Sequence, residues 1–346
     1  MDFRISRRQF LTTAAAGAAS IAVPGLGRAQ ALKSEYKLSV TNNRPAGYVE
    51  AAYQMAEIVA QKTNGRINIK VYPASQLVSG DATREFPSLR RGLFDFLVGS
   101  TINLAPHVKE MALFSLPFLM PDSRAWDAVV NSDVRKDLDA TLASRDVTAL
   151  SWSENGFRQL CNSQREVHKP GDMKGLKIRY AANPLYADIF TALGANPVQM
   201  SWADLQTSLA TGAVDGLETP VNTFREAKLY TLKQKYMSIW NYSTDANLTM
   251  VNTEVWNTFT PADREIIKAA AEQTAKWATS ESRKGLGAGG DRSSFVELGK
   301  LGVTVTELTD TEKAEFRKAT SDVMAKWAPQ VSAELVKKAQ AAIAKA

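Results

Sequence analysis

The sequence has few of the residues that support redox or metal chemistry. Its 346 residues include one cysteine, Cys161, and two histidines, His107 and His168. A lone cysteine cannot form an internal disulfide, and two histidines do not make a His-rich metal site. We therefore expect Cys161 to be buried and unreactive, and we predict no cofactor and no metal ion.

Long apolar runs and strong net charge are also missing. Beyond residue 31 the sequence has no stretch of about 18 apolar residues, so we predict no membrane-spanning helix and a soluble mature protein. The formal net charge is +6, but residues 1–31 hold four arginines and one aspartate, which leaves +3 for the rest. So small a charge, without basic runs interleaved with aromatics, predicts no nucleic-acid partner.

The sequence lacks the motifs of common enzyme classes. It contains no G-x-S-x-G elbow, no metal-binding motif and no histidine at a recognised spacing from a nucleophile. No spacing forces the carboxylates of Glu154, Asp204, Asp215 and Glu218 together, and Asp215 is expected to bond backbone amides in its turn. The glycines of residues 285–290 do not follow a strand, as a nucleotide-binding loop would. We predict that the protein is not an enzyme.

The first 31 residues have the order of an export signal. The twin-arginine pattern SRRQFL occupies residues 6–11, and an alanine-rich apolar run covers residues 12–26. Residues 29–31 read A-Q-A, which fits an A-x-A cleavage site. We predict a twin-arginine-type signal peptide over residues 1–31, a mature protein that begins near Leu32, and a periplasmic location.

The stretch from Lys174 to Pro220 alternates between strand and helix signals. Strand-like runs follow Lys174, Gly194 and Gly212, and Ser201 with Asp204 three residues later is close to a capping box. Residues 36–101 repeat this β-α-β-α-β order without repeating the sequence. Two such units predict an α/β protein with a mostly parallel sheet.

The later part of the chain reads mainly as helix. Thr260, Pro261 and Asp263 mark a strong helix start, and the glycines of residues 285–290 predict a break or kink, since each interior glycine costs roughly 1 kcal/mol against alanine. Further helices are expected over residues 122–142, 312–327 and 330–345.

Three ordered motifs resemble those of the solute-binding proteins of TRAP transporters, the C4-dicarboxylate-binding family. They are KGLKIR at 174–179, GANPVQM at 194–200 and LQTSLATGAVDGLETP at 205–220. The resemblance implies a two-lobed periplasmic-binding-protein fold with crossover strands and a long helix spanning both lobes. It places lobe I at residues 32–152 plus about 243–280, and lobe II at residues 153–242 plus about 281–346.

The same resemblance implies a function. We expect a receptor that closes by a hinge motion on a small organic-acid anion and delivers it to TRAP membrane permease subunits, as a monomer or a homodimer. The alternative is a ligand-binding subunit of the same fold in a periplasmic sensor.

The resemblance also implies a carboxylate clamp. Arg179 occupies the position of the clamping arginine, and Arg158, in an N-G-x-R turn at 155–158, is expected to assist. Thr219 replaces the asparagine of the family's Q-E-N-P motif, and Leu217 replaces the glutamine. Aromatic residues at motif positions predict an apolar wall, and strand-end positions add further candidates. These are Phe157, Tyr180, Trp202, Trp240 and Tyr242 for the wall, and Asn42, Gln76 and Thr101 at strand ends.

The amide side chains that the family motif has at positions 217 and 219 are absent here, and their loss favours a ligand with an apolar carbon skeleton. We therefore expect a monocarboxylate with an apolar or aromatic body, including 2-oxo acids, and we expect Trp240→Ala to cost affinity. A C4-dicarboxylate or a sugar acid is the alternative ligand.

Overall fold

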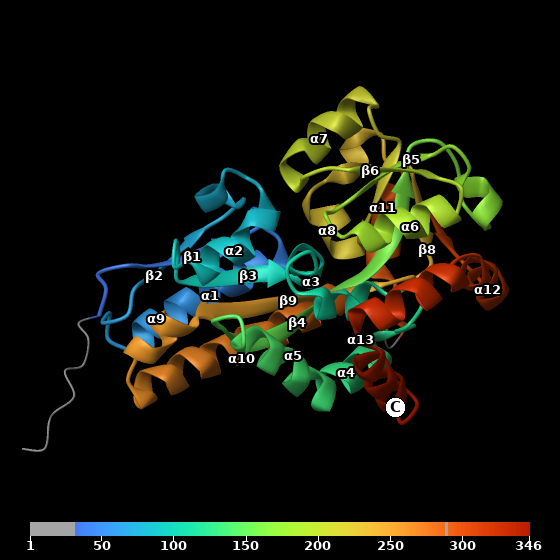
Figure 1. Ribbon diagram of the computed structural model, residues 1–346. Helices are drawn as coiled ribbons and strands as arrows, with labels where there is room; N and C mark the ends of the chain where they lie inside the picture. Colours follow the sequence, from blue (N-terminus) through green and yellow to red (C-terminus); the bar gives the residue numbers. More distant parts are fainter. Residues whose placement is uncertain (1–31, 288–289) are drawn as a thin grey trace, which may run out of the picture. The chain divides into compact units, whose positions relative to one another are not determined.

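The computed structural model describes residues 32–287 and 290–346, so the predicted signal peptide lies outside the described residues. The described chain is a mixed α/β fold (Figure 1). Its strands are β1 (Tyr36–Val40), β2 (Ile69–Tyr72), β3 (Phe96–Ser100), β4 (Val147–Asn162), β5 (Lys177–Tyr180), β6 (Asn196–Gln199), β7 (Gly216–Pro220), β8 (Tyr236–Ile239), β9 (Thr244–Asn252) and β10 (Thr304–Glu307).

The α-helices cover both faces of these strands. They are α1 (Gly47–Lys62), α2 (Glu85–Arg90), α3 (Thr101–Leu104), α4 (Ser123–Val130), α5 (Asp133–Ala143), α6 (Pro184–Ala192), α7 (Trp202–Thr211), α8 (Val221–Glu226), α9 (Thr253–Thr258), α10 (Pro261–Arg283), α11 (Ser293–Lys300), α12 (Asp310–Ala319) and α13 (Ser321–Ile343). Short 3-10 helices include η1 (Gln76–Val78), η2 (Ala82–Arg84), η3 (Lys109–Ser115), η4 (Pro170–Met173) and η5 (Leu229–Leu232).

The sheet confirms the α/β prediction but is less parallel than expected. Its order is β2-β1-β3-β9-β4-β7-β5-β6, with β8 pairing β4 and β10 pairing β8. The outer pairs are parallel, as in β1 with β2 and β5 with β6. In the middle, β4 and β9 run antiparallel to each other and to β7 and β3. The sheet is mixed because these two long strands carry the chain across it in opposite directions.

Strand β4 is one continuous strand of 16 residues. The turn expected at residues 155–158 is therefore wrong. The register of β4 against β9 shifts between Glu154 and Gly156, where Gly156 has φ 123°. A β-bulge at this point accommodates the glycine conformation without ending the strand. Hence the N-G-x-R segment lies within a strand that crosses the sheet.

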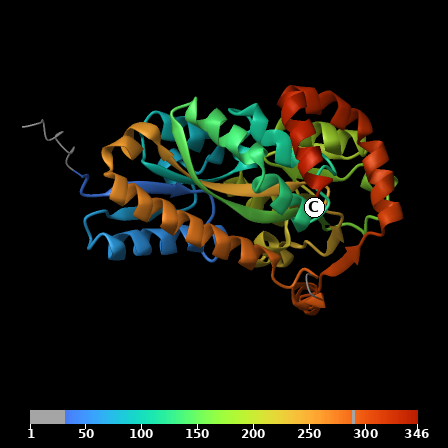
Figure 2. The same ribbon diagram turned by 90° about the horizontal axis from the view of Figure 1, so that it is seen from below.

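Helix α10 ends at Arg283, and α11 begins at Ser293. The break predicted at the glycines is thus confirmed, and Gly285 has φ 72°. Helix α10 lies along α1 and β4 (Figure 2). At its end Arg283 pairs with Asp127 of α4 at 2.6 Å and with Glu154 of β4 at 2.5 Å.

Two other helix boundaries differ from those expected. The helix predicted over residues 122–142 is split into α4 and α5, because Ser132 caps α5 by accepting a bond from the Val134 amide. The last two helices divide at Thr320 rather than near Pro329, where α13 is kinked instead, with Ser332 outside helical geometry. The predicted lobe boundaries stay a prediction.

The largest buried cluster contains an aromatic stack that joins distant segments. Trp240 lies 4.4 Å from the Tyr242 ring centroid and 5.2 Å from that of Phe316 in α12. Trp240 is 1% exposed, and Cys161 is fully buried elsewhere in the core. Trp240 is therefore a core residue that packs the C-terminal helices against the β8–β9 connection.

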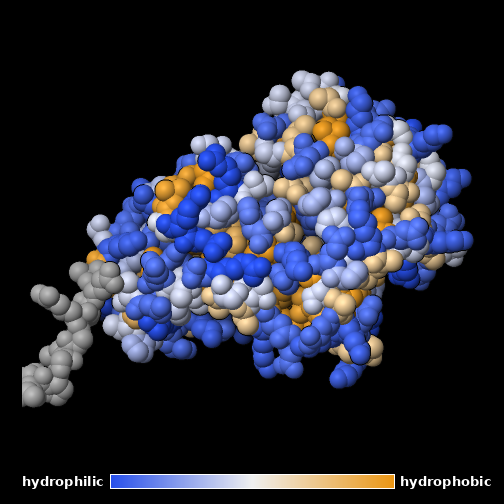
Figure 3. All heavy atoms as spheres, viewed as in Figure 1, coloured by the Kyte–Doolittle hydropathy of each residue, from blue (hydrophilic) through white to orange (hydrophobic). Residues whose placement is uncertain are grey.

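The face of the molecule in Figure 3 is mostly hydrophilic, with hydrophobic residues in small separate areas.

Trp240→Ala should lower the free energy of unfolding by about 3–5 kcal/mol, because a large buried ring would leave a cavity. Urea denaturation followed by circular dichroism measures this change. Leu93→Ala is the control, since Leu93 is 58% exposed and an exposed truncation should cost less than about 0.5 kcal/mol. Equal stability of the two variants would contradict the core assignment.

Candidate functional site

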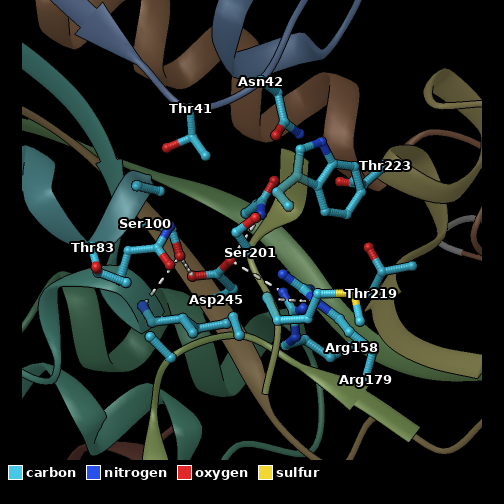
Figure 4. Close-up of a pocket in the computed structure, with 18 of the residues that line it drawn as sticks. Thr41, Asn42, Thr83, Ser100, Arg158, Arg179, Ser201, Thr219, Thr223 and Asp245 are labelled. Atoms are coloured by element: carbon cyan, nitrogen blue, oxygen red, sulfur yellow. Dashed lines mark hydrogen bonds and ion pairs between the residues drawn. The ribbon is translucent and has the colours of Figure 1, made fainter. Parts of the chain in front are cut away.

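A cavity of about 610 Å³ lies where the carboxyl ends of several strands meet. Ligands of open α/β sheets bind at such strand ends. The cavity takes residues from the ends of β3, β6 and β7, from the segments after β1, β5 and β6, from α1, η2, α3, α7 and α8, and from β4 and β9 (Figure 4). Its lining includes Thr41, Asn42, Tyr48, Asp81, Ala82, Thr83, Ser100, Ile102, Asn103, Asn155, Arg158, Arg179, Ala181, Ala182, Gln199, Met200, Ser201, Trp202, Asp204, Thr219, Pro220, Thr223 and Asp245.

The bulge in β4 brings two polar side chains to this cavity. In a regular strand, residues three apart point to opposite faces of the sheet. The register shift next to Gly156 lets both Asn155 and Arg158 line the cavity. Phe157, between them, packs into the core instead.

Arg158 is buried and fully engaged by carboxylates. Its Nε donates to Oε2 of Glu218, and its Nη2 donates to Oε1 of Glu218 at 2.8 Å. Nη1 donates to Oδ2 of Asp245 at 3.3 Å. Burial by itself would lower the pKa of Arg158, but the charge and hydrogen bonds of Glu218 outweigh it and raise that pKa well above its ordinary value. Arg158 is thus already compensated by the protein.

Asp245 connects strands from different parts of the sheet. Its Oδ1 accepts from the hydroxyls of Ser100 at 2.7 Å and Thr101 at 3.1 Å. Its Oδ2 accepts from Nδ2 of Asn155 at 2.8 Å, in addition to Arg158. Four donors thus hold this carboxylate, which is 1% exposed, and it fixes the orientations of the side chains around it.

Arg179 is buried without a carboxylate partner. It is 3% exposed, and no carboxylate oxygen in the described part of the chain forms an ion pair with it. Its Nε donates to the Met200 carbonyl at 3.0 Å, and its guanidinium lies 5.8 Å from the Trp202 ring centroid. Burial lowers the pKa of Arg179 to about 10, so the side chain stays charged at neutral pH. An unpaired buried charge is costly, so this arrangement is typical of an anion site.

The structure brings together five of the residues predicted for the site. Arg158, Arg179, Thr219, Trp202 and Asn42 all line the cavity. Figure 4 shows both arginines and Thr219 on one side, with Thr83 and Ser100 on the other.

The other predicted site residues do not line the cavity. Thr101 donates a hydrogen bond to Asp245, and Tyr242 donates to Oε2 of Glu218 at 3.1 Å. Both residues therefore contact the carboxylates that bind Arg158, but not the cavity. Trp240, like Phe157 and Tyr180, belongs to the core, and the Gln76 side chain is exposed. The expected apolar wall is consequently reduced to Trp202 and a few small residues. These aromatic residues were predicted from their motif positions, and a motif position cannot show whether a side chain faces a cavity or the core.

Several lining residues escaped prediction. Asn155 lies inside the quoted N-G-x-R motif, and its place there was an available signal. Asp245 and Thr223 have no local motif, because only the pairing of β4 with β9 and the position of α8 bring them to the cavity. Asp215 does bind a backbone amide, but not in its own turn as expected: its Oδ2 accepts from the Lys177 amide at the start of β5 at 2.8 Å.

Two further properties concern the described residues as a whole. Within residues 32–287 and 290–346, no group of three or more His, Cys, Asp or Glu side chains is placed to hold a metal ion. No helix in the same ranges combines the length and apolar character needed to cross a bilayer.

The fold and the cavity define a two-lobed receptor for a small solute. Residues 39–330 match the family model of the bacterial extracellular solute-binding protein, family 7, and the chain belongs to this family. Within it, the structure resembles the periplasmic solute-binding proteins of TRAP transporters.

Individual relatives support this assignment. A solved TRAP periplasmic solute-binding protein of Ralstonia eutropha, with bound (S)-2-acetolactate, is 49% identical, with a TM-score of 0.89 over 91% of this chain and 100% of that one. The 2,3-diketo-L-gulonate-binding periplasmic protein of Escherichia coli is 28% identical over 93% of this chain and 94% of its own. An uncharacterized protein of Sinorhizobium fredii is 31% identical over 94% of this chain. The matched region covers 58% of the length of that protein.

The stability of the ligand-free protein should respond differently to the same substitution at the two arginines. Arg158→Met strands the carboxylates of Glu218 and Asp245 and should lower the free energy of unfolding of ligand-free protein by about 3–5 kcal/mol. Arg179→Met removes an unpaired buried charge and should leave stability unchanged within about 1 kcal/mol, or raise it. Urea denaturation of ligand-free protein compares them, and a larger loss for Arg179→Met would contradict the charge assignment.

Proposed function

We propose that the protein is the solute receptor of a TRAP transporter and binds a small organic monocarboxylate through Arg179. The observation that carries this proposal is the burial of the Arg179 guanidinium at the cavity without a carboxylate partner. A planar guanidinium can make two parallel hydrogen bonds to one carboxylate. Binding would thus supply the charge compensation that Arg179 lacks.

The charges at the cavity favour one carboxylate over two. Arg158, the other cationic side chain among the described lining residues, is held by Glu218 and Asp245. The remaining charged lining residues, Asp81, Asp204 and Asp245, are acidic. A second carboxylate on the ligand would meet no free cation and would lie near like charges. This disfavours a C4-dicarboxylate.

The lining supports a polar ligand body rather than an aromatic one. Hydroxyl and amide side chains outnumber aromatic ones, of which Trp202 and Tyr48 are present. The ligands named for the Ralstonia and Escherichia relatives are both monocarboxylates that carry oxygen on the second and third carbons. Such oxygen-rich acids fit the lining better than the aromatic acids expected from the motif positions.

The wider role follows from the family. We propose that the ligand-bound receptor delivers its solute to the membrane permease and catalyses no reaction. The twin-arginine pattern at residues 6–11 supports export to the periplasm before delivery.

Arg179→Lys should weaken carboxylate binding at least about tenfold, because lysine lacks the planar fork. The probe is whichever of (S)-2-acetolactate, 2,3-diketo-L-gulonate and succinate most raises the melting temperature, and isothermal titration calorimetry then measures its affinity. Arg124→Lys is the matched control, since the Arg124 side chain is 82% exposed. Unchanged affinity in Arg179→Lys would refute the clamp.

Export should depend on the arginine pair. Replacing Arg7 and Arg8 together by lysine should leave precursor in the cytoplasm, because the twin-arginine route requires this pair. Cell fractionation and immunoblotting measure the distribution, and Arg28→Lys is a control within the same segment. A normal periplasmic yield from the double variant would show that export uses another route.

A further inference from the structure

A hydrogen bond joins two helices that pack on different halves of the sheet. The Gly47 amide, at the start of α1, donates to Oε1 of Glu226, at the end of α8, at 3.3 Å. Helix α1 packs against β1, β2 and β3, whereas α8 packs against β4 and β7. Tyr48, next to Gly47, and Thr223, in the same helix as Glu226, both line the cavity. The bond therefore connects two parts of the cavity wall.

Glu226 takes the place of an N-cap residue for α1. Ala46, which precedes the helix, has no side chain that can accept a bond from the first turn, and the first amides of a helix need acceptors. A carboxylate oxygen from another helix supplies one here. A Cβ atom added at Gly47 would lie 3.9 Å from Oε1 of Glu226 and 3.9 Å from Cβ of Glu281 in α10. Helices α1, α8 and α10 thus meet at this glycine.

The carboxyl group of Glu226 has one hydrogen bond and no ion pair among the described residues. Its second oxygen, Oε2, is buried without a partner in residues 32–287 and 290–346. The neighbouring Arg225 is engaged by Glu297 of α11 at 2.7 Å. Tyr48 adds no charge, because burial raises the pKa of its hydroxyl well above the ordinary value. An ionised carboxylate is therefore poorly compensated at this position.

The facing helices carry like charges. Glu281 of α10 pairs with Lys284, and Glu50 in the first turn of α1 pairs with Arg44 at 2.6 Å. Burial is the main cause that raises the pKa of Glu226 to about 7, and the charges of Glu281 and Glu50 add to it. The contact between α1 and α8 is thus more favourable when Glu226 carries a proton.

We infer that the hydrogen bond between Glu226 and the Gly47 amide is a latch, which holds the two halves of the receptor together over a bound solute and is loosened when Glu226 loses its proton. The inference rests on the proposed carboxylate receptor and on the hinge closure expected of it. Glu226 is not among the residues that line the cavity. It is a positioning residue, which acts on the solute through the closure of the cavity.

The direction of the pH effect follows from the burial of Glu226. When α1 and α8 separate, water reaches the carboxyl group, and its pKa falls toward the ordinary value of about 4.5. A group whose pKa is higher in the closed state binds its proton more tightly there, so protonation favours closure. This contribution is fully present below about pH 4.5 and is lost as the pH rises through about 7. Solute affinity should therefore fall with rising pH.

Two other titratable groups near the cavity do not follow closure. Burial lowers the pKa of Arg179 to about 10, so its charge is constant between pH 5.5 and 8.5. Burial also raises the pKa of Glu85 to about 7, but this carboxyl accepts from the hydroxyls of Ser39 and Thr41. All three residues lie on the same half of the sheet, so separation of α1 from α8 leaves Glu85 buried. Substitution of Glu226 alone thus isolates the latch.

Isothermal titration calorimetry at pH 5.5, 7.0 and 8.5 tests the latch. The probe is whichever of (S)-2-acetolactate and 2,3-diketo-L-gulonate raises the melting temperature more, since both carboxylates stay ionised over this range. The affinity of the native protein should fall at least about fivefold from pH 5.5 to pH 8.5. A constant affinity, or one that rises with pH, would overturn the latch but leave the carboxylate receptor standing. If neither acid binds at any pH, the proposed function fails for these acids, and the latch fails with it.

Two variants of Glu226 separate the proton from the hydrogen bond. Glu226→Gln keeps an acceptor for the Gly47 amide but cannot ionise, so its affinity should vary less than about twofold over the same pH range. At pH 8.5 it should bind the probe at least about threefold more tightly than the native protein. Glu226→Ala lacks the acceptor and should bind at least about threefold more weakly than Glu226→Gln at every pH.

The matched control is Glu265→Gln, because Glu265 is exposed on α10, and it should keep the native pH profile. A native profile in Glu226→Gln would overturn the role of Glu226. Equal affinities of the glutamine and alanine variants would overturn the hydrogen bond as the latch. If the alanine variant does not fold, the pH profile of the glutamine variant decides the outcome.

Discussion

The unpaired charge of Arg179 is the constraint on which the rest of the site depends. The structure buries this side chain at the cavity, and no carboxylate among the described residues forms an ion pair with it. By contrast, the neighbouring Arg158 is neutralised by Glu218 and Asp245. The two arginines, both in family motifs, thus lie in different electrostatic surroundings. The charge of Arg158 is compensated within the protein, whereas the charge of Arg179 is not, which costs stability in the ligand-free protein.

The long strands β4 and β9 are what place these charges. Strand β4 pairs with β9 over its first part and with β7 and β8 over its last. Asp245, on β9, collects donors from β4, from Ser100 at the end of β3 and from Thr101 at the start of α3. The strands that cross the sheet therefore carry Asn155, Arg158 and Asp245 to the cavity.

Polarity is the second feature of the site. The family motif places an asparagine where this chain has Thr219, and that exchange suggested an apolar ligand. The structure adds Asn155, Thr223, Asn103 and Gln199 to the lining, so polar groups lost at one position are present at others. Most of the aromatic residues expected there instead build the core around Trp240. The polarity of the cavity is consequently a property of its whole lining and not of one motif.

The sequence alone determined the α/β class and the helix break at the glycines, because local propensity and an ordered motif carry that information. The motif also predicted Arg179, which the structure places, buried, at the cavity. Its position after a strand end predicted Asn42, which lines the cavity, since strand ends converge in α/β sheets. Only the tertiary structure decided that Arg158 is already paired and that Trp240 and Tyr242 face away from the cavity. It alone identified Asp245 as the hub, because a contact between β9 and a bulge in β4 depends on pairing across about 90 residues of sequence. Periodicity reports which side of a strand is apolar, but only the packed fold shows what that side meets.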